Sequence, residues 1–250
     1  MSSANPKAQA WEAIGLKYYY LGRRSGKPTP STIRWFTRGL GPDCRCMVVG
    51  GTSVAVIRAA VATGCRVHVV DFSARVCSEL RNRVPDAVSI VNSDILQPLP
   101  GEEGSFTHLV CDALINRFDD GEARRFERRA MGLLPAGGVL RATVKLGHYP
   151  MDLRLLEIAR GQPVPGFWDE ATRTIDYGRM GDLLERGYAR HGGIPRRDLL
   201  GWYRNRGREK RYEESDLRQL FGPPEWSRVD IHPEASGSDR VCVEARRAQP

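Results

Sequence analysis

The sequence of 250 residues lacks any apolar run that approaches the roughly 18 residues needed to cross a membrane, which excludes an ordinary spanning helix. Its first residues, MSSANPKAQAWEAIG, lack the cationic and then apolar pattern of a secretory signal, so we expect no export. Hydrophobic residues make up 41% and charged residues 27% of the chain, as in a globular protein with a sizeable core. We therefore expect a cytoplasmic protein without a membrane partner; its oligomeric state stays open.

The sequence also lacks the cysteine motifs of redox and zinc sites. The six cysteines include no C-x-x-C pair, and no histidines stand at the spacing of a zinc site. Several cysteines lie in predicted strands, where a free thiol packs as a small hydrophobic group. We therefore expect reduced cysteines and no bound metal.

The charge is uneven rather than extreme. A net charge of +8 favours anionic partners without making the chain a polycation. Arginines and aromatic residues alternate in the stretch GYARHGGIPRRDLLGWYRNRGREKR, residues 187–211. Arginine binds carboxylate or phosphate in a fork geometry, and aromatic rings stack bases, so a solvated face, a site for a small anionic acceptor and RNA binding all remain open. RNA is the least favoured, because acidic residues such as Asp198 and Glu209 dilute the patch.

The most informative stretch is MVVGGTSVAVIRAAVATGCRVHVVDFS, residues 47–73. It predicts a strand that ends at Gly50-Gly51, a helix that ends at Gly64, and a second strand that ends at Asp71. Glycines let backbone approach a ligand, and a helix N-terminus offers unpaired N–H groups. An acid 21 positions after Gly50 is close to the roughly 20 expected where a carboxylate accepts hydrogen bonds from a ribose.

This stretch resembles the first two motifs of class I S-adenosylmethionine (SAM) methyltransferases. Gly50 matches the first glycine of the family's G-x-G-x-G loop, whereas Thr52 and Val54 replace the second and third. The segment LLPAGGVLRATV resembles the family's helix stop and fifth strand. The resemblance covers about residues 32–144 and 212–247.

The resemblance implies an α/β fold: a Rossmann-like, doubly wound, mostly parallel seven-stranded sheet with an antiparallel C-terminal strand and a helical insertion after the fifth strand. It divides the chain into an N-terminal cofactor cover (1–30), a core (31–147), a substrate-recognition insertion or lid (148–211) and a C-terminal completion of the core (212–250). Residue patterns predict strands at 67–70, 88–91, 106–112, 139–144, 226–231 and 240–245, and helices at 11–20, 32–39, 74–83, 122–134, 153–159, 180–188 and 216–221. We expect Ser31 to cap the helix at 32–39.

SAM is the cofactor that the resemblance implies, and its candidate contacts are Gly50, Gly51, Thr52, Ser53, Asp71, Phe72, Asp94, Ile95, Asp112, Ala113 and Tyr20. Asp71 would hold the ribose, Asp94 with Ile95 the adenine, and residues 50–53 the methionine end. Tyr18 and Tyr19 are further candidates beside Tyr20, although packing of these rings against the core explains them equally well.

Methyl transfer needs an aligned acceptor and, for a hydroxyl, a base. His148 is the candidate base, with a loop histidine bonded to backbone or water as the alternative; Asn116, Arg117 and Tyr149 are the candidate acceptor-binding residues. We expect methylation of oxygen or nitrogen in a small metabolite, with an anionic acceptor as one option. An RNA, protein or peptide methyltransferase, or a methyltransferase-like domain that binds cofactor or a partner without transfer, remains the alternative.

Overall fold

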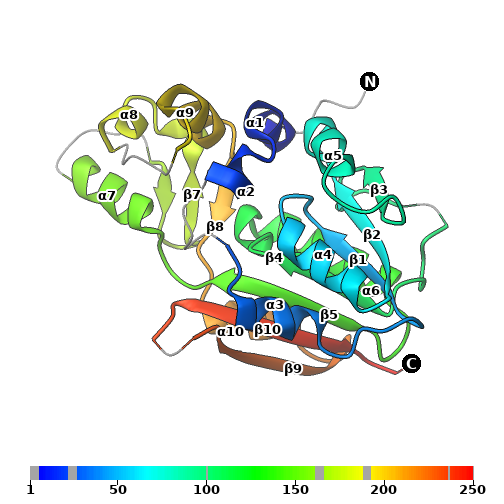
Figure 1. The fold of residues 1–250 in the computed structure, drawn as a ribbon. Coiled ribbons are helices and arrows are strands. Elements are labelled where there is room, and N and C mark those ends of the chain that lie inside the picture. The colour runs from blue at the N-terminus through cyan, green and yellow to red at the C-terminus, as the bar shows by residue number, and fades with distance from the viewer. Residues whose placement is uncertain are drawn as a thin grey trace.

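The computed structural model describes residues 6–21, 27–99, 101–160, 166–187, 193–235 and 237–249. Within these ranges a seven-stranded sheet has the order β3-β2-β1-β4-β5-β10-β9 (Figure 1). Its strands are β1 Arg45–Val49, β2 Arg66–Asp71, β3 Ser89–Asn92, β4 His108–Asp112, β5 Val139–Lys145, β9 Trp226–Pro233 and β10 Arg240–Arg247. The first five strands pair in parallel, and β10 is antiparallel to both β5 and β9. The predicted fold class is confirmed.

Helices cover both faces of this sheet. Because successive side chains of a strand point to opposite faces, each strand packs against both layers of helices. In β1, Cys46 and Val48 pack toward α3 (Pro30–Thr37), α4 (Val54–Ala62) and α5 (Ala74–Arg81). Met47 and Val49 pack on the other face with α6 (Asp120–Leu133) and α10 (Glu214–Leu220). The near-continuous apolar strands of the sequence are thus those of a parallel sheet that is buried on both sides.

The predicted core elements begin and end within a few residues of the observed ones, with one correction at a helix start. The side chain that caps α3 belongs to Thr29, whose hydroxyl accepts a hydrogen bond from the amide of Thr32. Ser31 was the wrong choice because Pro30 occupies the first helical position, which its fixed φ and missing N–H favour.

The insertion after β5 contains helices, as predicted, and also a small sheet that the sequence pattern did not predict. Its elements are α7 Pro150–Ala159, β6 Trp168–Asp169, β7 Thr174–Asp176, the 3₁₀ helix η3 Tyr177–Arg179, α8 Leu183–Gly187, α9 Arg196–Arg204 and β8 Arg208–Lys210. β7 pairs antiparallel with both β6 and β8. The predicted helix at 153–159 is confirmed, and α8 lies within the predicted 180–188.

The N-terminal segment packs with the insertion. Gly15, with a φ of +52°, separates α1 (Pro6–Ile14) from α2 (Lys17–Leu21), so the predicted helix at 11–20 is two helices. α1 contacts α9 and α5, and lies between them in Figure 1. Ala10 and Ile14 share a core with residues of α7 and α9. We call α1, α2 and the described residues between 150 and 211 the cap lobe. No described helix is both long enough and apolar enough to cross a membrane.

Candidate active site

A cavity lies between the carboxyl ends of the parallel strands and the cap lobe. Its empty space, including the part open to solvent, is about 1220 Å³. Strand tips and the loops after them contribute Val49, Gly50, Thr52, Ser53, Val70, Asp71, Phe72, Asp94, Ile95, Asp112 and Ala113, and the cap side contributes Lys7, Trp11, Tyr18, Trp202, Arg206 and Glu209. Ligands of open α/β sheets bind at this edge.

The turn after β1 approaches the cavity through two different glycines. Gly50 has a φ of +99°, and a Cβ built on it would meet nothing within 4 Å, so its backbone borders open space. Gly51 does not line the cavity; a Cβ there would lie 2.7 Å from Val76 Cγ1 of α5. This close approach lets the Gly51 amide donate a hydrogen bond to Asp71 Oδ2 at 2.7 Å.

Asp71 lies at the tip of β2 with its carboxylate fixed from two sides. The Ser73 amide donates to Oδ1 at 2.8 Å, opposite the bond from Gly51. Burial raises the pKa of Asp71 to about 6, although both amides favour the charged form. The carboxylate is therefore held in place at the cavity wall and is costly to keep ionised.

Asp94 and Ile95 follow β3 at the same end of the cavity as Phe72. Asp94 Oδ1 accepts a hydrogen bond from the Leu96 amide at 3.0 Å, which fixes the turn after the strand. Ile95 is buried and supplies an apolar surface beside this carboxylate. An acid and an apolar side chain together suit a base with an exocyclic amino group.

Asp112, the last residue of β4, and Ala113, which follows it, also line the cavity. Thr143 Oγ1 donates to Asp112 Oδ1 at 2.5 Å, and Arg240 forms an ion pair with the same carboxylate. Burial raises the pKa of Asp112, and the guanidinium of Arg240 opposes that shift. Ala113 has a φ of +52° and donates its amide to the Thr143 carbonyl at 3.1 Å, which turns the chain out of the strand.

The cap side of the cavity is aromatic and rich in arginine. Trp11, Tyr18 and Trp202 form a cluster with ring centroids 5.2 to 5.6 Å apart. Arg117, from the 3₁₀ helix η2 (Ile115–Arg117), and Arg206 lie beside it and share the carboxylate of Glu209.

Five predicted site residues do not line the cavity: Gly51, described above, and Tyr20, Asn116, His148 and Tyr149. Tyr20 is 44% exposed, and Tyr18 and Tyr19 take its place. Asn116 is fully buried, and its amide group exchanges hydrogen bonds with the backbone of Lys145, which secures η2 to β5. His148 packs on Trp168 with ring centroids 4.6 Å apart, and its buried Nδ1 has no hydrogen-bond partner within the described residues.

Tyr149 reaches the site only indirectly, because its hydroxyl accepts a hydrogen bond from Arg117 Nη2 at 3.1 Å. Arg117 itself lines the cavity. The roles given to these residues from sequence remain predictions. Tyr188, Arg190 and His191, which belong to the basic stretch, lie outside the described residues.

Sequence reasoning assigned the cap side to the site as regions, residues 1–30 and 148–211, but did not identify most of the cap residues that line the cavity. Trp11 lies in the predicted helix at 11–20, and Trp202 and Arg206 lie in the arginine-rich stretch at 187–211, without individual roles. Glu209 was counted only as an acid that dilutes that stretch. The alternation of arginine and aromatic residues was a usable signal. It did not indicate that Arg206 and Arg211 are buried, with relative exposures of 5% and 1%.

Searches against protein-family models and against curated proteins find no match. Among solved structures, a Rhodobacter sphaeroides protein provisionally named a Zn-dependent alcohol dehydrogenase is 32% identical, with a TM-score of 0.90 over 98% of this chain and 100% of that one. The chain belongs to the family of that protein.

Two methyltransferases show the fold that this family shares. The CcbJ methyltransferase of Streptomyces caelestis is 15% identical, with a TM-score of 0.64 over 97% of this chain and 99% of that one. The 1,6-didemethyltoxoflavin-N1-methyltransferase of Burkholderia thailandensis, crystallised with its namesake ligand and S-adenosylhomocysteine, is 13% identical, with a TM-score of 0.59 over 100% and 92% of the chains. The predicted class I methyltransferase fold is confirmed.

Because the name of the Rhodobacter relative includes zinc, we asked whether side chains of this chain could ligate a metal ion. No three His, Cys, Asp or Glu side chains of the described residues form a group that could hold a metal ion. The six cysteines are free thiols, and all but Cys44 are buried. The described residues of this chain therefore offer no ligand set of the kind that zinc requires.

Proposed function

We propose that this protein is a SAM-dependent methyltransferase that methylates oxygen or nitrogen of a small, anionic molecule. The observation that carries the proposal is the line of strand-tip groups along one cavity: the Gly50 backbone, the anchored Asp71 carboxylate and Asp94. Because the strands lie in the order β3-β2-β1, these groups would match the parts of SAM in order, from the methionine end to the ribose to the adenine.

The residues present fit this cofactor. Gly50 leaves open space where a side chain would intrude, and the carboxylate of Asp71 is held by backbone amides at the wall of the cavity. Asp71 would accept hydrogen bonds from the ribose hydroxyls, and Asp94 with Ile95 would hold the adenine. When bound, SAM supplies an electrophilic methyl group. The chain then has to align the acceptor and exclude water, which is the work of the cap lobe.

The sheet supports this function over nicotinamide chemistry. Dinucleotide-binding folds have the strand order 3-2-1-4-5-6. Here β10 enters between β5 and β9 and runs antiparallel to both. The strand order is therefore that of a methyltransferase core.

The burial of arginines in the basic stretch favours a small acceptor molecule over RNA. A nucleic-acid surface needs exposed cations that can contact phosphates. Arg206 and Arg211 are instead buried and paired with carboxylates. The part of the basic stretch that borders the cavity thus faces inward.

Calorimetric titration with S-adenosylhomocysteine, the demethylated cofactor, tests the proposal. We expect saturable binding by the wild type, no binding of NAD, and at least about tenfold weaker S-adenosylhomocysteine binding for Asp71→Ala, because a hydrogen bond to a charged group is lost. Asp86→Ala, which changes an exposed acid outside the cavity, is the matched control and should bind like the wild type. Binding of NAD but not of S-adenosylhomocysteine would overturn the proposal.

A further inference from the structure

The two ends of the cavity carry opposite charge. Asp71 and Asp94 line the end formed by the strand tips, and Asp112, which also lines it, is paired with Arg240. Arg117 and Arg206 line the cap end. Lys7, which also borders the cap end, forms an ion pair with Glu122, so these two charges offset each other.

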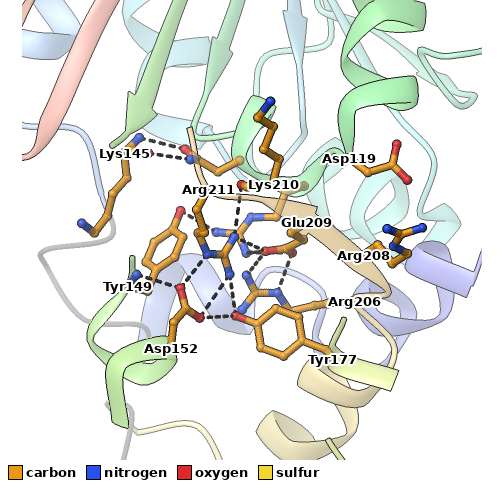
Figure 2. A network of polar contacts seen from close by, with 12 residues as sticks. Asp119, Lys145, Tyr149, Asp152, Tyr177, Arg206, Arg208, Glu209, Lys210 and Arg211 are labelled. Carbon is orange, nitrogen blue, oxygen red and sulfur yellow. Dashed lines mark hydrogen bonds and ion pairs between the residues drawn. The ribbon is translucent and has the colours of Figure 1, made fainter. Parts of the chain in front are cut away.

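The charges behind the cap end do not balance. Arg206, Arg117 and Arg211 all contact the carboxylate of Glu209. Arg211 also binds Asp152, with Nε 2.6 Å from Oδ2. Three guanidiniums therefore share two carboxylates, and Figure 2 shows Arg206 and Arg211 directed at the same Glu209.

This surplus positive charge is buried. The side chains of Glu209, Arg211 and Asp152 are at most 1% exposed, and that of Arg206 is 6% exposed. Burial alone would lower the pKa of Arg117, but the Glu209 carboxylate and the nearby tyrosine hydroxyls together outweigh it and raise the pKa, so the guanidinium stays charged. A buried charge without its counter-ion is expensive, and a bound anion would offset that cost.

Arg117 has donors available for such an anion. It is the most exposed of the three arginines, with a side chain 17% exposed and bordering the cavity. Its bonds go from Nη1 to Glu209 at 3.2 Å and from Nη2 to the Tyr149 hydroxyl at 3.1 Å. A guanidinium carries five N–H donors in a fork, so this geometry leaves room for a carboxylate.

The walls around Arg117 favour a planar ring. Trp202 lies 5.8 Å from the Arg117 guanidinium and 4.6 Å from that of Arg206. Trp11 and Tyr18 border the same space. Flat aromatic faces beside cations accept a conjugated ring by stacking.

We infer that the acceptor is an aromatic or heteroaromatic carboxylate whose single negative charge binds Arg117 and balances the buried surplus of the cap lobe. This inference rests on the proposed function and names its substrate class. The carboxylate anchors the molecule and is not the methylated group, because an oxygen that accepts hydrogen bonds from guanidinium is a weaker nucleophile. A hydroxyl or amine elsewhere on the ring attacks the methyl carbon of SAM; the carbon–sulfur bond breaks, S-adenosylhomocysteine leaves, and the acceptor's proton is released to water.

The first test uses the wild-type protein and three acids: benzoate, 4-hydroxybenzoate and anthranilate. Each acid and its neutral carboxamide is titrated calorimetrically into protein alone and into protein saturated with S-adenosylhomocysteine. We expect at least one acid to bind about tenfold or more tightly than its carboxamide, and more tightly than phenyl phosphate. The inference is wrong if no acid exceeds its carboxamide, or if phenyl phosphate binds best. Failure of S-adenosylhomocysteine to bind would count against the proposed function instead.

The second test replaces the anchor. Arg117→Gln should remove the preference for acid over carboxamide, and Arg117→Lys, which keeps the charge but not the fork, should retain part of it. Arg204→Gln is the control, because Arg204 is an exposed arginine of α9 that pairs with Glu185. An acid preference that persists unchanged in both Arg117 variants would overturn the inference. The wild-type comparison still decides if a variant fails to fold.

Discussion

Asp71 shows how one side chain would meet two requirements of the proposed cofactor site. Its carboxylate must point at the ligand, and the amides of Gly51 and Ser73 fix that direction. It must also be ionised, and burial opposes ionisation by raising its pKa to about 6. The two amides reduce that opposition without abolishing it, so the site is poised to lose its charge in mildly acidic solution.

Affinity for S-adenosylhomocysteine should therefore depend on pH. Above about pH 7 the carboxylate is charged and affinity is constant. As the pH falls through about 6, Asp71 gains a proton, loses acceptor strength, and affinity falls. Calorimetry between pH 5 and pH 8 measures this. Asp71→Asn should bind weakly with a flat profile, and a wild-type profile equally flat down to pH 5 would contradict the assignment.

Gly51→Ala should damage both stability and binding. Its new Cβ would lie 2.7 Å from Val76 Cγ1, so either the Val76 side chain or the turn that carries the amide bonded to Asp71 must shift. We expect a loss of about 1–3 kcal/mol in the free energy of unfolding, together with weaker S-adenosylhomocysteine binding.

The control for Gly51→Ala is Gly132→Ala, inside α6, where an added Cβ would meet nothing within 4 Å. That variant should gain about 0.5–1 kcal/mol in the free energy of unfolding, because alanine is the better helix former. Urea unfolding measures both changes. Equal stability for the two variants would show that Gly51 is not needed for close packing.

Sequence reasoning located the strand-tip side of the site because it depends on chain-local features. Gly50 and Asp71 are recognisable by their positions at the ends of apolar runs, and both line the cavity. The cap side depends on which residues meet after folding. Trp11 and Trp202 are far apart in sequence yet lie 5.6 Å apart between ring centroids, and no local pattern specifies that contact.

At the scale of elements, β8 connects the cap lobe to the core. Lys210 donates its amide to the Phe118 carbonyl at 2.8 Å, and Glu209 binds Arg117 of η2. On its other side Arg211 reaches Asp152 of α7. β8 thus pairs with β7, while Glu209 within it and Arg211 directly after it form ion pairs with η2 and α7. Figure 2 shows Glu209, Arg211 and Asp152 of this network.

Asp152→Asn should destabilise the protein strongly. Asp152 is fully buried and accepts hydrogen bonds from Arg211, from the Tyr177 hydroxyl at 2.9 Å and from the Tyr149 amide at 2.8 Å. Loss of its charge leaves Arg211 with less compensation, at a cost of about 3–5 kcal/mol in the free energy of unfolding. Chemical denaturation measures the loss. Asp182→Asn, an exposed acid just before α8, should change stability by less than about 0.5 kcal/mol.

The elements that sequence reasoning missed are short or disguised. β6, β7 and β8 have two or three residues each, too few for an alternation of apolar and polar positions to show. In α9 the run of arginines obscured the face formed by Leu199 and Tyr203, which are buried. The long core elements were predictable because their apolar periodicity extends over several turns or a whole strand.

For the whole molecule, the cap lobe and the edge of the sheet line opposite sides of the cavity with different kinds of side chain. The sheet supplies backbone and acids of the kind that hold a nucleoside, and the cap lobe supplies rings and arginines that suit an anionic acceptor. SAM carries one net positive charge and would be repelled by the arginines at the cap end of the cavity. The acids beside the cofactor and an anionic acceptor between it and the arginines would reduce that repulsion. Neither side makes a complete site alone.

A crystal structure of the protein with S-adenosylhomocysteine tests this account most directly. We expect the ribose hydroxyls at the Asp71 carboxylate, the adenine beside Asp94 and Ile95, and the sulfur facing the space bordered by Arg117 and Trp202. A crevice between the tips of β1 and β2 that is filled by protein side chains at saturating ligand, or a ligand bound elsewhere, would contradict it.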